Sequence, residues 1–289
     1  MNNSTSPTAT LLAECADQPG LIAKVTQFLC DNHGNIVDLE QHVDTADKRF
    51  FMRVQWQLDH FKLPPDKIDA IFNEQIGAPL NMNWCITYSE TKPRMAVFVS
   101  QHGHCLFDIL SRHQSGEWHA DIPLIISNHT TFEQQANNAG IPFYHLPVNA
   151  KNKQQQEKAQ LDLLAEHDID TVVLARYMQI LSADFIDHYP NNIINIHHSF
   201  LPAFPGAKPY HSAHERGVKI IGATSHYVTT ELDAGPIIAQ DIVRIRHNDS
   251  VDDLKRKGQD NEKIVLSRAI RHHLQHEVLV YKNRCIVFD

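Results

Sequence analysis

The fold of the larger part of the chain is decided by a short apolar strand that runs directly into a polar, proline-rich loop. This stretch reads Ile193-Ile194-Asn195-Ile196-His197-His198-Ser199-Phe200-Leu201-Pro202-Ala203-Phe204-Pro205-Gly206. A short apolar run of this kind predicts a strand that is covered on both faces, as in a parallel sheet. Asn195 and His197 are two positions apart on this strand, so their side chains point to the same face.

Apolar strands and helices alternate along the rest of residues 93–289. Strands are predicted at residues 95–99, 122–126, 171–175, 220–228 and 237–246, and helices at residues 106–113, 130–139 and 152–166. The alternation indicates an α/β domain with a Rossmann-like, mostly parallel sheet. In such a sheet the ligand crevice lies beyond the carboxyl ends of the strands, where His197 and the loop after it fall.

The first ninety residues have a different order of elements: strand, helix, strand, strand, helix, strand. Strands are predicted at residues 8–15, 36–43, 50–58 and 81–88, and helices at residues 21–32 and 65–76. This order is the ferredoxin-like βαββαβ arrangement. Residues 89–94 are polar and contain a proline, which is typical of a linker. We therefore expect two domains, residues 8–90 and residues 93–289.

The composition argues against several classes of partner. The 289 residues carry a formal net charge of −8, and 42% of them are hydrophobic. An acidic chain lacks the basic footprint of nucleic-acid-binding proteins, and no apolar run approaches the ~20 residues that span a bilayer. The polar start of the chain has neither the basic nor the apolar segment of a signal peptide. These features predict a cytoplasmic protein with a small-molecule partner, no nucleic acid and no membrane.

The cysteines and histidines show no metal-binding pattern. The five cysteines are scattered without a CxxC pair, which argues against a disulfide framework and a structural zinc site. Among the 20 histidines, His211 and His214, together with His197 and His198, form the best candidate cluster. Because this neighbourhood lacks the HExxH or Cys/His spacing of zinc sites, we expect no metal.

Two strand ends could bring an amide, an imidazole and a carboxylate together. Asp233 lies in the predicted loop Leu232-Asp233-Ala234-Gly235-Pro236. Attack on a formyl or similar acyl carbon puts negative charge on its oxygen, which the Asn195 amide and a protonated His197 would stabilise. Asp233 would keep His197 protonated and, directly or through a water, take the proton of the nucleophile. Taken singly, the three residues also fit a strand-end amide, a solvated imidazole and a turn-capping carboxylate.

These motifs resemble the formyltransferase fold that handles 10-formyltetrahydrofolate. The resemblance rests on residues 195–206, on Ala223-Thr224-Ser225-His226-Tyr227-Val228 and on Leu232-Asp233-Ala234-Gly235-Pro236-Ile237-Ile238, and it covers roughly residues 93–289. It implies that Asn195, His197 and Asp233 are catalytic. It also implies that the substrate is bound by Gly206 and by a folate pocket that includes Met178, Gln179, Ile180 and Leu181. Relatives often carry arginine where this chain has Gln179.

The N-terminal domain resembles an ACT domain. The resemblance rests on Asp17-Gln18-Pro19-Gly20-Leu21 at the first strand-to-helix turn and on Gly34-Asn35-Ile36 after the first helix. It implies a regulatory module that binds an amino-acid effector at Asp17, Gly20, Leu21, Asn35 and Ile36. It also implies assembly through this module into a homodimer or homotetramer. If Gly20 and Gly34 only punctuate helix ends, no effector binds there.

An ACT-like domain ahead of a formyltransferase-like domain, together with His104-Cys105-Leu106, resembles the formyltetrahydrofolate deformylases. This resemblance implies hydrolysis of 10-formyltetrahydrofolate to formate and tetrahydrofolate without a cofactor, which supplies formate for one-carbon and purine metabolism.

Two other functions stay open at this stage. A formyltransferase that acts on an amine such as glycinamide ribonucleotide would need a glycine-rich phosphate-binding turn, whereas Ser100-Gln101-His102-Gly103-His104 contains a single glycine. A non-catalytic sensor of folate or of an amino acid would bind folate without turnover.

Overall fold

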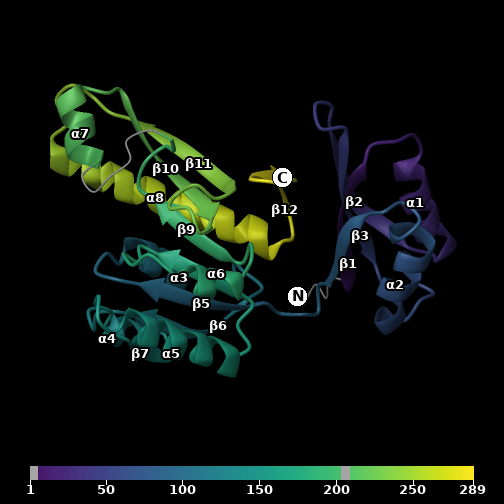
Figure 1. The fold of residues 1–289 in the computed structure, drawn as a ribbon, viewed down its shortest axis with the longest axis horizontal. Coiled ribbons are helices and arrows are strands. Elements are labelled where there is room, and N and C mark those ends of the chain that lie inside the picture. Colours follow the sequence, from purple (N-terminus) through teal and green to yellow (C-terminus); the bar gives the residue numbers. More distant parts are fainter. Residues whose placement is uncertain (1–5, 203–208) are drawn as a thin grey trace. The chain divides into compact units, whose positions relative to one another are not determined.

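The computed structural model describes residues 6–202 and 209–289. It divides into two compact units, which Figure 1 shows as ribbons. One unit runs to Lys92 and also includes the C-terminal segments His276–Leu279 and Ile286–Asp289, and the other comprises Pro93–Gln275 and Val280–Cys285. Among the described helices, none combines the length and the apolar character that a membrane crossing requires.

The N-terminal unit is built on a four-stranded antiparallel sheet. Its elements are β1 (Thr8–Ala16), α1 (Leu21–Asp31), β2 (Asn35–Asp44), β3 (Arg49–Gln57), α2 (Pro65–Phe72), a π-helical turn (Asn73–Gly77) and β4 (Asn83–Tyr88). The strand order β2-β3-β1-β4 confirms the predicted βαββαβ arrangement. Helices α1 and α2 lie on the same face of this sheet (Figure 1), where Phe28 and Phe72 meet edge to face with ring centroids 5.4 Å apart.

The end of the chain returns to the N-terminal unit. The strands β12 (Val278–Tyr281) and β13 (Arg284–Val287) form a hairpin. Arg53 of β3 donates from Nε to the carbonyl oxygen of His276 at 3.1 Å, across 223 positions of sequence. The expected domains assigned all of residues 93–289 to the second domain and did not include this return, because no local pattern encodes a contact between such distant residues.

The larger unit is built on a seven-stranded sheet. Its elements are β5 (Arg94–Val99), α3 (His104–Gln114), β6 (Asp121–Ser127), α4 (Glu133–Asn138), β7 (Phe143–His145), α5 (Lys153–Glu166), β8 (Thr171–Ala175), α6 (Ala183–Asp187), β9 (Ile193–His197), α7 (Pro209–Arg216), β10 (Ile220–Tyr227), β11 (Ile237–Arg244) and α8 (Val251–Leu274). The strand order is β11-β10-β9-β8-β5-β6-β7. Strands β5 to β9 run parallel, and β10 and β11 are antiparallel, which confirms the mostly parallel sheet.

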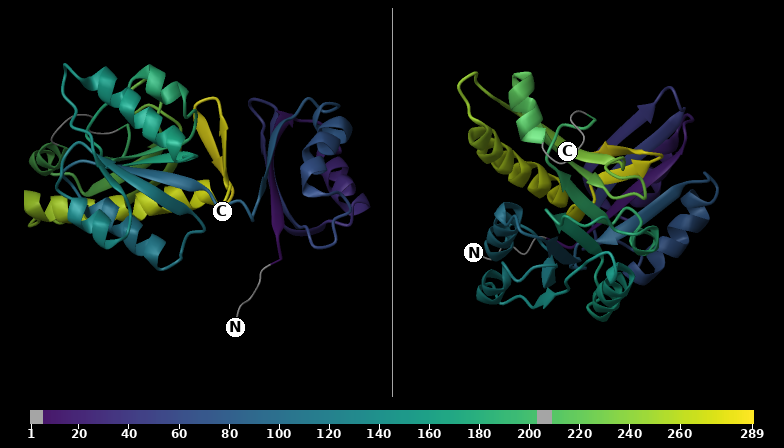
Figure 2. Two further views of the ribbon diagram at one scale, coloured as in Figure 1. Left: turned by 90° about the horizontal axis from the view of Figure 1, so that it is seen from below. Right: turned by 60° about the vertical axis from the view of Figure 1, so that its left-hand side comes forward.

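The central strands of this sheet are covered on both faces. All residues from Met95 to Val99 of β5 are fully buried. Ala96 and Phe98 pack in one cluster with Leu164 of α5 and Phe185 of α6. Helix α8 packs against β9, β10, β11 and α3, and Figure 2 shows helices on both sides of the sheet. Because both faces of these strands are buried, apolar residues follow one another along the strand instead of alternating with polar ones.

Two short elements of the larger unit were not predicted from the sequence. Strand β7 has three residues and helix α6 has five, too few to establish a pattern. Ser182 before α6 could have indicated the helix, because its Oγ accepts a hydrogen bond from the Phe185 amide at 3.2 Å. The helix predicted at residues 130–139 covers only Glu133–Asn138, because Phe132 before it has a non-helical backbone (φ −113°, ψ 14°).

The carboxyl ends of the parallel strands form one edge of the sheet. Strand β5 lies between β6 and β8, so the chain leaves β5 toward one side and later returns to its other side. A crevice opens at such a switch point. His104 follows β5, Arg176 follows β8, and His197 ends β9. These polar side chains therefore meet at the edge where a ligand is expected.

The backbone of the loop between β10 and β11 is closely constrained. Its two ends are joined by a hydrogen bond of 2.9 Å from the Tyr227 amide to the Pro236 carbonyl. Asp233 adopts a positive φ of 55°, which aspartate tolerates better than most residues. A Cβ atom on Gly235 would lie 1.8 Å from the carbonyl oxygen of Tyr227, so only glycine fits.

Replacement of Gly235 by alanine tests this path. We expect Gly235→Ala to lower the free energy of unfolding by about 3 kcal/mol, the upper end of ordinary overpacking costs, because backbone must move. Urea unfolding measures the effect. The matched control is Gly116→Ala, where φ is 73° and nothing lies within 4 Å, so that only backbone strain of about 1 kcal/mol is added. Equal losses in the two variants would show that the contact with Tyr227 is not what requires glycine.

Candidate active site

The three residues predicted to be catalytic lie together at the carboxyl edge of the larger sheet. Asn195 and His197 come from β9, and Asp233 comes from the β10–β11 connection. The Nδ1 atom of His197 lies 3.2 Å from Oδ2 of Asp233. Asn195 and Asp233 approach the same third side chain, His226. Residues that are 38 positions apart in the chain thus share one small site.

His226 is a site residue that the sequence analysis quoted in a motif but did not assign. It lies directly opposite Asn195 in the β9–β10 register. Its Nδ1 lies 2.8 Å from the Tyr227 carbonyl, and its Nε2 lies 3.2 Å from Nδ2 of Asn195 and 3.7 Å from Oδ1 of Asp233. Nε2 of His226 thus lies between the Asn195 amide and the Asp233 carboxylate and links the two groups. His226 reaches this position because β10 pairs with β9, a contact that the sequence pattern does not show.

Asp233 carries a firmly ionised carboxylate. Hydrogen bonds with His197 and then with His226 lower the pKa of Asp233 far below its usual range, although partial burial opposes them. Each carboxylate oxygen faces one imidazole. The side chain keeps about a quarter of its surface exposed, with a relative accessibility of 27%. The carboxylate therefore holds a negative charge next to two imidazole rings.

One ring nitrogen of His197 is left for a ligand. His197 is 7% exposed, and its Nε2 atom is buried without a hydrogen-bond partner among the residues that the structure describes. Its Nδ1 faces Asp233. A buried polar atom without a partner is costly in a finished fold. Nε2 of His197, beside the Asn195 amide, therefore marks the place where a polar atom of the substrate would bind.

The segment implied to line a folate pocket follows β8. Met178 and Ile180 are 56% and 62% exposed, and Gln179 is half-buried. These two apolar side chains are available to a flat ligand. Leu181, in contrast, is 7% exposed and packs in the core that α5 and α6 share with the sheet. Gly206, the remaining predicted substrate-binding residue, lies outside the described residues.

The residues implied to bind an effector differ in exposure. Asp17, Gly20 and Asn35 are exposed, Ile36 is half-buried, and Leu21 is buried at 3%. Leu21 belongs to the apolar core of the N-terminal unit, and Ile36 packs against that core. Gly20 adopts a positive φ of 88° directly before α1, a conformation that favours glycine. The exposed members of the set surround the start of α1 and the start of β2.

A second polar group lies at the same edge and is called here the Glu262 cluster: Glu262, His104, Arg176 and Tyr210. Oε2 of Glu262 lies 2.8 Å from Nε2 of His104 and 3.4 Å from Nε of Arg176. Its Oε1 accepts a hydrogen bond of 2.8 Å from the Tyr210 hydroxyl. Burial alone would raise the pKa of Glu262, but the hydrogen bond with His104 and the charge of Arg176 outweigh it and lower that pKa. The buried negative charge of Glu262 therefore has a partner at each of its two carboxylate oxygens.

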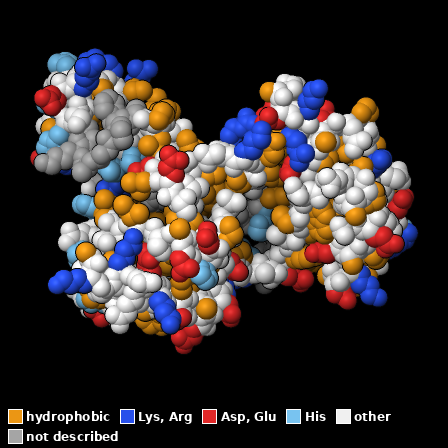
Figure 3. Space-filling view, viewed as in Figure 1, with side chains coloured by type: hydrophobic (Ala, Val, Ile, Leu, Met, Phe, Trp, Pro, Cys, Tyr) orange, Lys and Arg blue, Asp and Glu red, His pale blue; other side chains and the backbone are white. Residues whose placement is uncertain are grey.

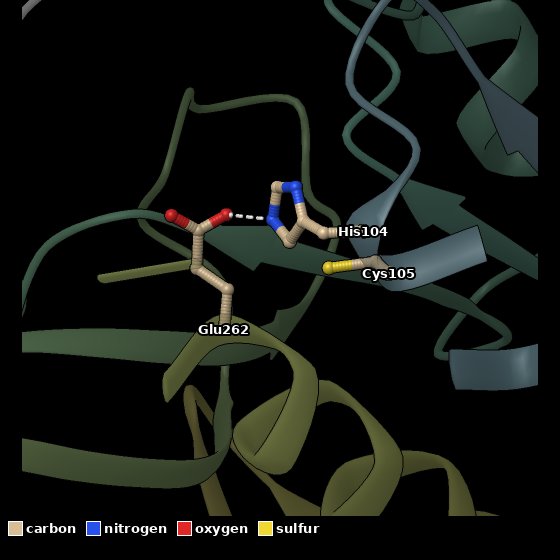
Figure 4. Close-up of side chains that lie close together, drawn as sticks. All are labelled: His104, Cys105 and Glu262. Carbon is tan, nitrogen blue, oxygen red and sulfur yellow. Dashed lines mark hydrogen bonds and ion pairs between the residues drawn. The ribbon is translucent and has the colours of Figure 1, made fainter. Parts of the chain in front are cut away.

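Part of this cluster has the composition of a metal site. His104, Cys105 and Glu262 present donor atoms within 4.8 Å of one another. Figure 4 shows the three side chains. Both oxygens of Glu262 already have partners, however, and Arg176 supplies the positive charge. Burial raises the pKa of the Cys105 thiol well above its usual value, so this sulfur is protonated and a poor ligand. The arrangement favours an internal ion pair.

The histidines singled out in the sequence lie elsewhere. His211 and His214 are exposed on α7, and among the described residues neither belongs to a group of side chains with metal-ligand spacing. On the face drawn in Figure 3, basic and acidic side chains of the larger unit are interspersed rather than gathered by sign. Over its described residues, that face shows no continuous basic surface of the kind that binds nucleic acid.

Both domains of the chain resemble known protein families. A family described as formyl transferase matches residues 93–270, and the ACT domain family matches residues 9–55. A curated formyltetrahydrofolate deformylase of Synechocystis is 55% identical over 97% of this chain and 98% of its own length. That of Bacillus subtilis is 44% identical over 96% and 93%.

Solved structures extend the likeness to three dimensions. A formyltetrahydrofolate deformylase from Pseudomonas syringae superposes with a TM-score of 0.96 at 44% identity, covering 100% of this chain and 96% of its own. A glycinamide ribonucleotide transformylase from Symbiobacterium toebii gives a TM-score of 0.64 at 31% identity, and covers only 68% of this chain. With both domains matched over nearly the full length, the chain belongs to the formyltetrahydrofolate deformylase family.

Proposed function

We propose that this protein hydrolyses 10-formyltetrahydrofolate to formate and tetrahydrofolate. The observation that carries the proposal concerns His197: its Nε2 is buried and has no hydrogen-bond partner among the described residues, while its Nδ1 faces the Asp233 carboxylate. Relatives named for this activity match the chain over nearly its whole length, which supports the same assignment. The chemistry can then be derived from the groups at the site.

The formyl oxygen binds between Nε2 of His197 and the amide of Asn195. When water attacks the formyl carbon, the carbonyl electrons move to this oxygen, and preformed donors stabilise the charge that develops there. The carbon–nitrogen bond then breaks, and the folate nitrogen takes a proton as it leaves. The His226 ring, 3.2 Å from Nδ2 of Asn195, would hold this amide in place beside the formyl oxygen.

Asp233 acts in this scheme as a fixed negative charge. Its carboxylate lies 3.2 Å from Nδ1 of His197 and favours a positively charged ring while the formyl oxygen is negative. Sequence analysis also gave Asp233 the role of accepting the proton of the nucleophile. The hydrogen bonds that lower the pKa of this carboxyl keep it ionised before the reaction, and the ionised carboxylate would also take the proton of the nucleophile, directly or through a water, and pass it to the folate nitrogen as that nitrogen leaves.

The other groups of the site complete the proposal. Met178 and Ile180 would contact the flat ring system of the folate, with no cofactor taking part. The N-terminal unit would bind an amino-acid effector and would join copies of the chain into a homodimer or homotetramer. We place the enzyme in the cytoplasm, where the formate that it releases enters one-carbon and purine metabolism.

An amine acceptor is the competing possibility, because glycinamide ribonucleotide transformylases share the fold of the larger unit. Their substrate carries a phosphate. In this chain the turn after β5 leads into His104, whose side chain is engaged by Glu262. A ring committed to a buried carboxylate is not available to a phosphate, and this favours water as the acceptor.

The decisive experiment measures formate release from 10-formyltetrahydrofolate without any amine. We expect Asp233→Asn to reduce kcat about 10³-fold, because one preorganised charge at an oxyanion site is worth this much, and to retain folate binding. The matched control is Asp187→Asn, an exposed aspartate of α6, which should behave as wild type. Turnover by the wild type only after glycinamide ribonucleotide is added would replace the hydrolase with a transferase. Folate binding without turnover in either condition would indicate a sensor.

The pH dependence of the same variant tests the ionisation of Asp233. A carboxyl whose folded pKa is lowered stays ionised as pH falls, and its stabilisation is lost only below about pH 4. We therefore expect the ratio of wild-type to Asp233→Asn activity to stay constant between about pH 5 and about pH 8. Parallel pH profiles of formate release give this ratio. A ratio that declines toward pH 5 would mean that Asp233 titrates in that range.

A further inference from the structure

The loop that joins β8 to α6, residues 176–182, presents apolar side chains to solvent. Met178 and Ile180 are 56% and 62% exposed. Connecting loops at a protein surface are ordinarily more mobile than the elements they join. In this loop, however, Tyr177 and Leu181 on either side of the exposed pair are 5% and 7% exposed. The loop is therefore fastened to the interior on both sides of its exposed apolar residues.

The backbone of Met178 is fixed by residues at the ends of two strands. Ser100, which follows β5, accepts at Oγ a hydrogen bond of 3.0 Å from the Met178 amide. The same hydroxyl donates to Oδ1 of Asn128, which follows β6, at 2.7 Å. Ser100 and Asn128 are 2% and 9% exposed, so water competes little with these bonds. One buried hydroxyl thus joins the middle of the loop to the central sheet.

Helix α5 turns two polar side chains toward the interior. Its buried residues are Glu157, Gln160 and Leu164, whose spacing places them on one face of the helix. Glu157 and Gln160 are 7% and 0% exposed. Burial of a carboxylate or an amide costs free energy unless the group is hydrogen-bonded. Apolar residues would cover the sheet without this cost, so the two polar side chains need partners that justify their burial.

Both of these side chains bond to the β8–α6 loop. Nε2 of Gln160 donates to the Tyr177 hydroxyl at 3.0 Å. Oε1 of Glu157 accepts a hydrogen bond of 3.0 Å from the Ser182 amide. Lys153, one turn earlier on α5, places its Nζ 3.8 Å from the same carboxylate oxygen and balances the charge. The two polar residues of α5 therefore hold the start and the end of the loop.

A loop held in this way is ordered before any ligand arrives. A ligand that docks on a mobile loop must order it, and each side chain that becomes immobilised lowers the affinity. Met178 and Ile180 lie between the fixed points, so a flat ligand can contact them without that loss. The function proposed above places the ring system of the folate on these two side chains.

We propose that three buried polar residues, Ser100, Glu157 and Gln160, are positioning residues that preform the folate-contacting surface of the β8–α6 loop. This inference rests on the proposed hydrolysis of 10-formyltetrahydrofolate. The three residues act through Met178 and Ile180 and take no part in the chemical step. Their loss should therefore weaken the ground state and the transition state equally, which raises KM and leaves kcat unchanged.

Replacement of Glu157 tests the hold on the end of the loop. Methionine has a similar volume but offers no oxygen to the Ser182 amide. We expect Glu157→Met to raise KM for 10-formyltetrahydrofolate about 10-fold, because the substrate must then order the loop on binding. The value of kcat should stay close to that of the wild type. Steady-state formate release measures both constants. Glu157→Gln keeps an acceptor oxygen and should restore KM.

A second variant tests the middle of the loop independently. Ser100→Ala removes one oxygen atom, the acceptor for the Met178 amide, and we expect a similar rise in KM. The inhibition constant of tetrahydrofolate, the product, should rise in parallel. The matched control is Glu166→Met, the same exchange at an exposed position of α5, which should leave KM unchanged.

A combined variant distinguishes positioning from a general loosening of the fold. Met178→Ala together with Ile180→Ala removes the side chains through which Glu157 acts, and this pair should raise KM by itself. In that background Glu157→Met should raise KM no further, because effects that pass through the same contacts are not additive. A general structural defect would instead raise KM by the same factor in both backgrounds.

The results separate the positioning role from the hydrolase assignment. The positioning role would be overturned by a wild-type KM in folded Glu157→Met and Ser100→Ala proteins, by a loss confined to kcat, or by a full additional rise of KM in the alanine background. An unchanged KM in the alanine pair itself would overturn it as well. In all these cases the hydrolase assignment stands, whereas a wild-type protein that releases no formate would overturn both.

Discussion

The contact between Asp233 and His197 is the interaction on which the site depends. It joins a strand end of the parallel part of the sheet to a loop beyond its antiparallel extension, and it does so at 3.2 Å. The loop reaches this position only because its ends are tied at Tyr227 and Pro236 and because Gly235 leaves no side chain in the way. A carboxylate half-removed from water persists there because two imidazoles compensate it.

A second, deeper ion pair supports the opposite side of the site. Glu262 is almost fully buried, and removal of one partner from such a group leaves an uncompensated charge. Its partners come from α3, the end of β8 and α7, so one carboxylate ties together three segments that surround the carboxyl edge. Arg176 adopts a positive φ of 63°, a strained conformation of the kind that gathers at functional sites. These contacts fix the relative positions of the three segments around Glu262.

Sequence patterns located much of this arrangement, and for clear reasons. Strands β5, β8 and β9 are covered on both faces, so their consecutive residues are mostly apolar and the strands can be recognised in the sequence. Asn195 and His197 share a strand face because side chains alternate. The short elements β7 and α6 left too few residues for a pattern, and His276, just before the C-terminal hairpin, is bonded to Arg53, 223 positions away.

The sequence by itself determined the order of strands and helices, the two-part organisation and the identity of the polar groups at one strand end, because these follow from local periodicity and residue chemistry. Only the tertiary structure decided which of those groups meet. The pairing of His226 with Asn195 is set by strand register, and the exclusion of Leu181 from the surface is set by packing against α5 and α6. The Glu262 cluster unites residues up to 158 positions apart. Such contacts depend on how elements pack, which no local stretch of sequence specifies.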